Sequence, residues 1–121
     1  MAKHLETGKR GEQLATEYLE TIGYKILERN WRHSYAEVDI IARHGDILVF
    51  VEVKTRSNDR FSKPEDAIDE KKEDFIASVA PVYMEQIGHE WEIRFDFISV
   101  VIPKSGKVRI RHMKDAFWGM F

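Results

Sequence analysis

The chain has 121 residues, 43% of them hydrophobic and 33% charged, with a formal net charge of −2. This length suits one domain over residues 1–121 with a single core, and a charge so near neutral argues against binding nucleic acid by bulk electrostatics alone. The sequence has no cysteine, which excludes disulfides and thiolate metal sites, and its lack of a leader pattern or membrane-length apolar run indicates a cytoplasmic protein without membrane contact.

Residues 7–22 are expected to form the first helix, because their apolar side chains recur at helical spacing and Gly23 follows as a stop signal. Glu12 lies at the edge of the apolar stripe, beside Lys9 and Arg10. On the residues alone, Glu12 pairs most simply with a neighbour on the helix surface. The two cations are either solvated or contact phosphate groups.

Residues 24–31 are expected to form the first strand, and residues 32–35 a short turn into the next one. The turn carries an aromatic residue, Tyr35. We expect Tyr35 to cover an edge of the core in preference to stacking on a base or sugar.

Residues 36–56 contain two apolar runs with four charges set into them, and they are expected to form a hairpin. Gly45 supplies the positive φ that the first central position of a type II′ turn needs. A two-residue turn at Gly45 and Asp46 then sets His44 opposite Ile47.

The same register predicts what each face of the hairpin carries. One face would be apolar, with Val38, Ile40, Ala42, Val49, Val51 and Val53. The other would place Asp39 opposite Glu52, and Glu37 opposite Lys54, at the end away from the turn. A slip of one residue would mix charge into the apolar face, which the hydrophobic pattern disfavours.

The charged residues on this hairpin form a candidate catalytic site. Asp39 and Glu52 offer the hard oxygen ligands that suit Mg²⁺ or Mn²⁺ held together with water and a substrate phosphate. Lys54 would act on the attacking water and offset phosphate charge. The alternative is a cross-strand charge ladder on a solvated sheet face, and we favour the metal site because apolar residues flank these charges.

The polar loop at residues 55–63 leaves directly from the candidate site and carries further cations. Arg56 and Lys63 are candidates for gripping phosphates near the scissile bond. A second helix should follow, because residues 62–65 match a capping box. Its Lys71 or Lys72 would point toward the site.

We expect Pro81 to kink or break this second helix, which should end at Gly88. Residues 91–102 then predict a strand that is apolar on both faces and therefore interior to the sheet. Within it, Asp96 is expected to pair with Arg94 or to bond at the strand end, in preference to acting near the catalytic site.

Cations alternate with apolar residues near the C-terminus, at Lys107, Arg109 and Arg111. They indicate either a stripe that binds a DNA backbone or a charged edge strand that discourages aggregation, and the sequence does not separate the two. The apolar tail at residues 116–121 would either dock on the core or contribute to a homodimer contact.

Several stretches resemble a known protein family. The chain is similar to the YraN-like family of small bacterial proteins in the PD-(D/E)XK nuclease superfamily. The matching stretches are GKRGEQLATEYL, GYKILERNWR, EVDIIA, VFVEVKTR, FSKPEDAI and RFDFISV, and they cover most of residues 8–100. Two positions depart from the family pattern, because Ala36 and Ser62 stand where the family usually has glycine.

The resemblance implies that Asp39, Glu52 and Lys54 occupy the superfamily's catalytic positions. It also implies that Glu12 corresponds to an acidic residue on the first helix of Holliday-junction resolvases and assists the metal site. Glu37 would ligate a second ion or pair with Lys54. The two departures from the family pattern remove no metal ligand and bear on how a backbone approaches the substrate.

The expected fold is α/β, with a restriction-endonuclease-like core and a mixed sheet of about five strands flanked by helices. The leading function is Mg²⁺- or Mn²⁺-dependent hydrolysis of DNA, with branched or flapped DNA among the candidate substrates. The alternatives are a non-catalytic module that binds nucleic acid in repair, and an assembly factor that acts through its apolar tail.

Overall fold

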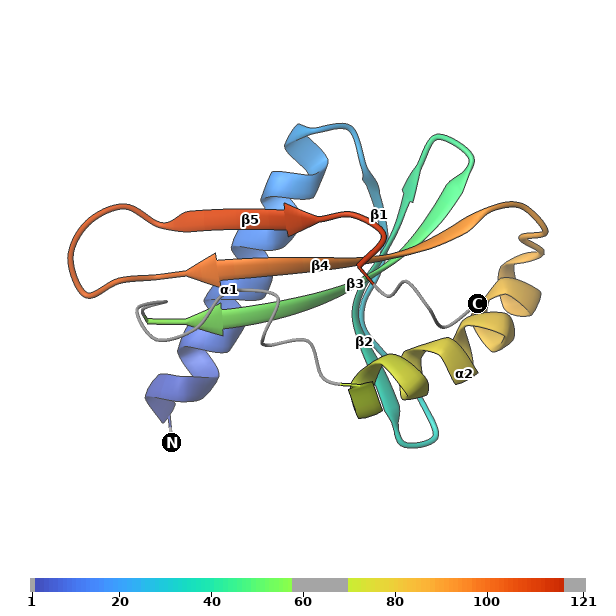
Figure 1. Cartoon of the computed structure of the whole chain (residues 1–121), viewed down its shortest axis with the longest axis horizontal. Coiled ribbons are helices and arrows are strands. Elements are labelled where there is room, and N and C mark those ends of the chain that lie inside the picture. The colour runs from blue at the N-terminus through green and yellow to red at the C-terminus, as the bar shows by residue number, and fades with distance from the viewer. Residues whose placement is uncertain (1, 58–69, 117–121) are drawn as a thin grey trace.

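A computed structural model describes residues 2–57 and 70–116 (Figure 1). In chain order its elements are α1 (Ala2–Thr21), β1 (Lys25–His33), β2 (Ala36–His44), β3 (Ile47–Arg56), α2 (Glu70–Ile87), β4 (Ile93–Val101) and β5 (Arg109–Met113). None of the helices in this described part is long and apolar enough to cross a membrane.

The five strands form one mixed sheet in the order β1-β2-β3-β4-β5. Strands β3 and β4 pair in parallel, and the other neighbours pair antiparallel. A parallel pair requires a crossover connection, and α2 lies on the connection between β3 and β4. The predicted α/β class and the mixed five-stranded sheet flanked by helices are confirmed, and the predicted strand at residues 91–102 is an interior strand, as expected.

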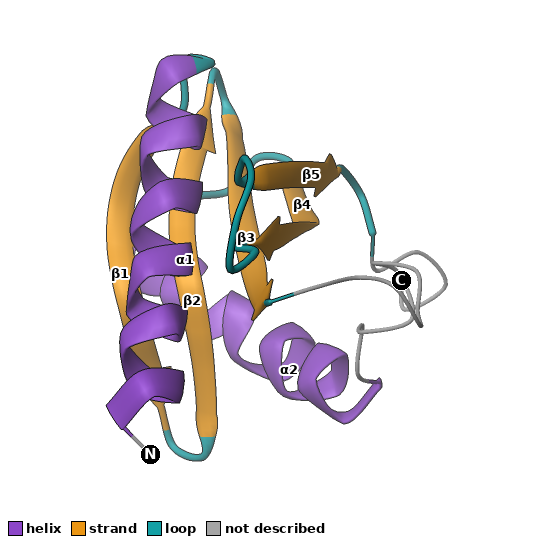
Figure 2. Cartoon of the chain, turned by 90° about the vertical axis from the view of Figure 1, so that its left-hand side faces the viewer, coloured by secondary structure: helices purple, strands orange, loops and turns teal. Residues whose placement is uncertain are grey.

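The two helices cover opposite faces of the sheet (Figures 1 and 2). The α1 face buries Ala15, Leu19, Tyr24, Ile40, Ala42, Val49, Val51, Ile98 and Val100. The α2 face buries Ala36, Val38, Ile41, Leu48, Phe50, Ile76, Val79, Ala80, Tyr83 and Phe95. Because neighbouring residues of a strand alternate between faces, membership of these two clusters shows where each strand residue points.

The predicted hairpin register is confirmed from His44 opposite Ile47 to Ile40 opposite Val51. The prediction for Val38 is wrong, because Val38 packs on the α2 face whereas Ile40 packs on the α1 face. Two residues that are two positions apart point to opposite faces only if the alternation slips between them. The slip occurs at Asp39, where the β2–β3 pairing ends.

The neighbouring strand is irregular at the same level. Asn30 of β1 has φ = 54°, a left-handed conformation that asparagine tolerates better than most residues. It lies between the pairs that Arg29 forms with Ile40 and Trp31 forms with Val38, so it stands across from Asp39. Both strands therefore depart from regular pleating beside the candidate site.

Two further expectations are corrected. The predicted break at Pro81 is wrong, because α2 continues through this residue with Val79, Ala80 and Tyr83 buried on both sides of it, and core packing outweighs the lost backbone hydrogen bond. Tyr35 does not cover the core, because 94% of it is exposed in the β1–β2 turn. The predicted capping box at 62–65 and the tail at 117–121 lie outside the described residues.

Candidate active site

Asp39 lies where the pairing of β2 with β3 ends. Beyond this point its carboxylate, in place of the β2 backbone, bonds to β3. Its Oδ2 accepts a hydrogen bond of 2.8 Å from the backbone N–H of Val53, and only 7% of the residue is exposed. Burial raises the pKa of Asp39 above its ordinary value, although the Val53 N–H and the charge of Lys72 act in the opposite direction. The bond to Val53 occupies one carboxylate oxygen and leaves Oδ1 to contact another group.

Glu52 and Lys54 follow each other on the α2 face of β3, because Leu48 and Phe50 of the same strand belong to the α2-face cluster. The Glu52 side chain is 13% exposed, and its Oε1 lies 3.8 Å from Nζ of Lys72 on α2. The ion pair confirms the expectation that Lys71 or Lys72 points toward the candidate site, and Lys72 is the lysine that does so. Lys54 is exposed at the rim.

Glu12 reaches the same region from α1. Burial, and then the negative charge of Asp39, raise the pKa of Glu12, while a hydrogen bond with the side chain of Asn30 lowers it. Because the charge of Asp39 acts on the pKa of Glu12, the acid of α1 and the acid of β2 lie near each other. Asn30 was missed from the sequence, although an asparagine inside a strand pattern is itself a signal of irregular backbone.

The remaining predicted site residues are dispersed. Glu37 forms an ion pair of 2.9 Å with Arg32 on β1, so the partner seen in the structure differs from the expected Lys54. Lys9 and Arg10 are exposed on α1. Arg56 is half-buried at the end of β3, and Lys63 lies outside the described residues.

A cleft of about 890 Å³ opens between the first half of α1 and the ends of β3 and β4. Glu12, Lys54, Arg56 and Lys104 line it, together with Gly8. A Cβ atom added to Gly8 would meet nothing within 4 Å, so the backbone of α1 faces open space there. The cleft thus brings one candidate acid, Glu12, together with several cations, whereas the described residues Asp39 and Glu52 do not line it.

A family model described as "Uncharacterised protein family UPF0102" matches residues 11–100. The chain belongs to this family. A UPF0102 protein of Bacteroides thetaiotaomicron is 47% identical over 118 residues, which cover 98% of this chain and 97% of the relative. Another, from Christiangramia forsetii, is 44% identical over 98% of both chains.

Among solved structures, the chain is similar to one described as "The structure of Pyrococcus Furiosus SfsA in complex with Ca2+". The TM-score is 0.37 and the sequence identity is 16%, over 92% of this chain and 63% of that chain. The expectation of a YraN-like family is confirmed by the UPF0102 match.

The acidic residues of this UPF0102 protein suit a metal ion that is shared with water and substrate better than one enclosed by protein ligands alone. Among the described residues, no three His, Asp or Glu side chains are grouped closely enough to hold a metal ion by themselves. Asp39 and Glu52 instead offer carboxylates from adjacent strands. Mg²⁺ characteristically binds through one or two carboxylates while water and substrate phosphates complete its shell, so the donor set fits this mode.

Proposed function

We propose that this protein hydrolyses phosphodiester bonds of DNA with Mg²⁺ or Mn²⁺, at the point where β2 and β3 separate. The observation that carries the proposal is the position of Asp39. It is a carboxyl group with 7% exposure whose burial raises its pKa, in contact with the backbone of the strand that carries Glu52 and Lys54. A buried acid with a perturbed pKa beside other charged groups is a candidate functional residue.

Each residue has a distinct proposed role. Asp39 and Glu52 would hold the metal ion. Glu12 would assist from α1, because its pKa is raised by burial and then by the charge of Asp39, which acts on it across the site. The metal, when bound, would polarise the phosphate and make its bound water more acidic. Lys54 would orient the attacking water and offset the phosphate charge.

Two residues in contact with these groups would have positioning roles. The Val53 N–H holds one oxygen of Asp39 in place, and Lys72 holds Glu52 at 3.8 Å. Lys72 would also offset the negative charge of the site before substrate and metal arrive. Membership of the PD-(D/E)XK nuclease superfamily, which the sequence motifs imply, supports the same assignment.

The test is cleavage of labelled single-stranded, duplex, flapped and four-way-junction DNA, with Mg²⁺ or Mn²⁺ and with a chelator. Wild-type protein should cut at least one substrate only when the metal is present. Lys54→Ala should lower the rate about 100-fold or more, the usual range for losing a positioned proton-transfer group. Because Lys54 is exposed, the variant should keep the wild-type melting temperature.

The matched control is Lys25→Ala, which removes an exposed lysine from β1 of the same sheet and should leave cleavage unchanged. Cutting that survives Lys54→Ala would contradict the proposed site. Binding of DNA by wild-type protein without cleavage of any substrate would favour the non-catalytic module. The assembly-factor alternative depends on residues 117–121, so deleting them should abolish partner binding and spare cleavage if both readings hold.

A further inference from the structure

The structure places the cations of β5 on the same side of the sheet as the candidate site. Strand β5 is an edge strand in which Arg109 and Arg111 are exposed, whereas Ile110 between them and His112 after them are half-buried. Ile110 packs into the α1-face cluster. Arg109 and Arg111 therefore point to the α2 face, the face that carries Glu52.

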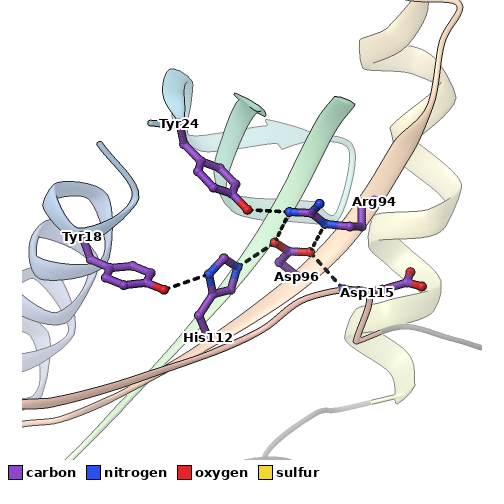
Figure 3. A network of polar contacts seen from close by, with 6 residues as sticks. All are labelled: Tyr18, Tyr24, Arg94, Asp96, His112 and Asp115. Atoms are coloured by element: carbon purple, nitrogen blue, oxygen red, sulfur yellow. Dashed lines mark hydrogen bonds and ion pairs between the residues drawn. The ribbon is translucent and has the colours of Figure 1, made fainter. Parts of the chain in front are cut away.

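A buried polar network on the α1 face keeps His112 turned inward and so fixes which side of β5 faces α1 (Figure 3). Nε2 of His112 donates to Oδ2 of Asp96 at 2.7 Å, and the hydroxyl of Tyr18 on α1 lies 3.2 Å from His112 Nδ1. The side chains of His112 and Asp96 are only 4% and 0% exposed. Turning β5 over would bury Arg111 in place of His112, at a large cost in free energy.

The network extends along β4 as well. Arg94 donates to both oxygens of Asp96, at 2.8 and 2.9 Å, and the backbone N–H of Asp115 donates to Oδ1 at 3.1 Å. Asp96 thus fixes β5 both at His112 and just beyond the end of the strand (Figure 3). Two residues of β5, Arg109 and Arg111, are held on the α2 face as a consequence.

Strand register aligns these arginines with the cations of β3. Lys54 pairs with Ser99, which pairs with Arg111, and in the next row Arg56 and Arg109 flank Val101. Each row spans β3, β4 and β5, and successive rows are roughly 6.7 Å apart. The preceding row contains Glu52. The α2 face thus changes from acidic to basic within two rows.

We infer that Arg109 and Arg111 bind the phosphate backbone of the nucleic acid on the β5 side of the scissile bond, an inference that rests on the proposed function. Charge identifies this occupant, because the sequence from Phe97 to Lys114 contains five Lys or Arg residues and no acid, although the whole chain has a net charge of −2. An edge strand needs charge only somewhere along its length to discourage pairing. Alignment with Lys54 and Arg56 is an additional property that backbone binding explains.

The test is binding of a fluorescein-labelled single-stranded oligonucleotide and of its duplex, in chelator so that no cleavage occurs. The double variant R109Q/R111Q should weaken single-strand binding roughly 20-fold at 0.1 M salt and reduce the slope of log K against log salt by about 1.4, the value for two lost phosphate contacts. R109K/R111K keeps both charges and should restore most of the affinity. Melting temperatures of both variants confirm that β5 remains folded.

The matched control is K25Q/R43Q, which removes two exposed cations that pair across β1 and β2. It should leave the affinity close to that of wild type. Equal weakening by the control, or unchanged binding by R109Q/R111Q, overturns the inference without touching the proposed function. Conversely, a wild-type protein that binds through these arginines but cuts no substrate with Mg²⁺ or Mn²⁺ contradicts the proposed function and leaves only the binding of the phosphate backbone by Arg109 and Arg111 standing.

Discussion

At the scale of single residues, burial makes Asp39 a costly group for the fold. Its folded-state pKa is raised by burial, so the native state favours the neutral carboxyl and the unfolding free energy falls as the pH rises through this pKa. At neutral pH an ionised Asp39 is therefore a destabilising group. A residue that costs stability at this position is typical of function.

Asp39→Asn should raise the melting temperature at pH 7, because the amide oxygen still accepts from Val53 N–H and no charge remains to be buried. The gain should shrink as the pH is lowered toward 4, where the wild-type carboxyl is increasingly protonated. Thermal unfolding followed by circular dichroism measures both. Asp74→Asn, which changes an exposed acid of α2, should show neither effect. A lower melting temperature for Asp39→Asn would contradict this account.

Asp96 has the opposite linkage. Burial alone would raise its pKa, but hydrogen bonds from His112 and Arg94 outweigh burial, and the pKa of Asp96 lies below its ordinary value. Its stabilising effect is thus fully present above the unfolded-state pKa of about 3.9 and is lost as the pH falls through the folded-state value. Arg94 depends on the same carboxylate for two of its hydrogen bonds.

Asp96→Asn should lower the unfolding free energy at pH 7 by about 3–5 kcal/mol, because Arg94 would be left without its counter-charge in a mostly buried position. The difference from wild type should narrow below pH 4. Urea denaturation at several pH values measures it. A constant difference from pH 7 to 3 would show that the ionised carboxylate is not the stabilising group.

Among the elements, α1 approaches β3 at a glycine. A Cβ atom added to Gly11 would collide with the side chain of Thr55, whereas one added to Gly8 would meet nothing within 4 Å. Gly11→Ala should therefore lower the unfolding free energy by about 1–3 kcal/mol through overpacking. Gly8→Ala should raise it by about 0.5–1 kcal/mol through helix propensity. Denaturant titration of the two variants measures both changes in unfolding free energy. Equal effects would contradict the close approach of α1 to β3 at Gly11.

The helix α2 retains Pro81 in its interior at an exposed position. Because proline lacks the N–H that would bond to the carbonyl of Ala77, Pro81→Ala should stabilise the protein by about 1–3 kcal/mol. Calorimetric melting would show the increase. A decrease would mean that the shape proline imposes is needed to seat Ala80 and Tyr83 against the sheet.

The hairpin was predictable where local rules determine it and unpredictable where they compete. A two-residue turn at Gly45 fixes the register as far as Ile40, and the apolar pattern does the rest. Beyond Ile40 the side chain of Asp39 competes with the backbone for Val53 N–H, and no periodicity in the sequence reports that competition. Val38 was consequently assigned to the wrong face.

The face of β5 was equally hidden from the sequence. Alternation showed that Arg109 and Arg111 share a face, but which face depends on His112 reaching Asp96 on β4 and Tyr18 on α1. Contacts between residues so far apart in the chain leave no local pattern. The expected pairing of Asp96 with Arg94 is confirmed, while the participation of His112 was not foreseen.

Across the whole molecule, the two faces of the sheet carry different sets of polar and charged groups. The α1 face carries the polar network that holds β4, β5 and α1 together, and the α2 face carries Glu52 and Lys54 in line with the cations of β5. Asp39, at the interruption between β2 and β3, is coupled electrostatically to Glu12 of α1 and to Lys72 of α2. Under the two proposals, Glu52, Lys54 and the arginines of β5 would act on the same face of the sheet.

The most direct measurement is the single-turnover rate of DNA cleavage by Asp39→Asn, on whichever substrate the wild-type protein cuts with Mg²⁺ or Mn²⁺. The variant keeps the hydrogen bond to Val53 and loses only the charge that would bind the metal, so we expect cleavage at least about 100-fold slower in a protein at least as stable as wild type. Asp74→Asn should cut at the wild-type rate. Wild-type rates for a folded Asp39→Asn would contradict a catalytic site at this position.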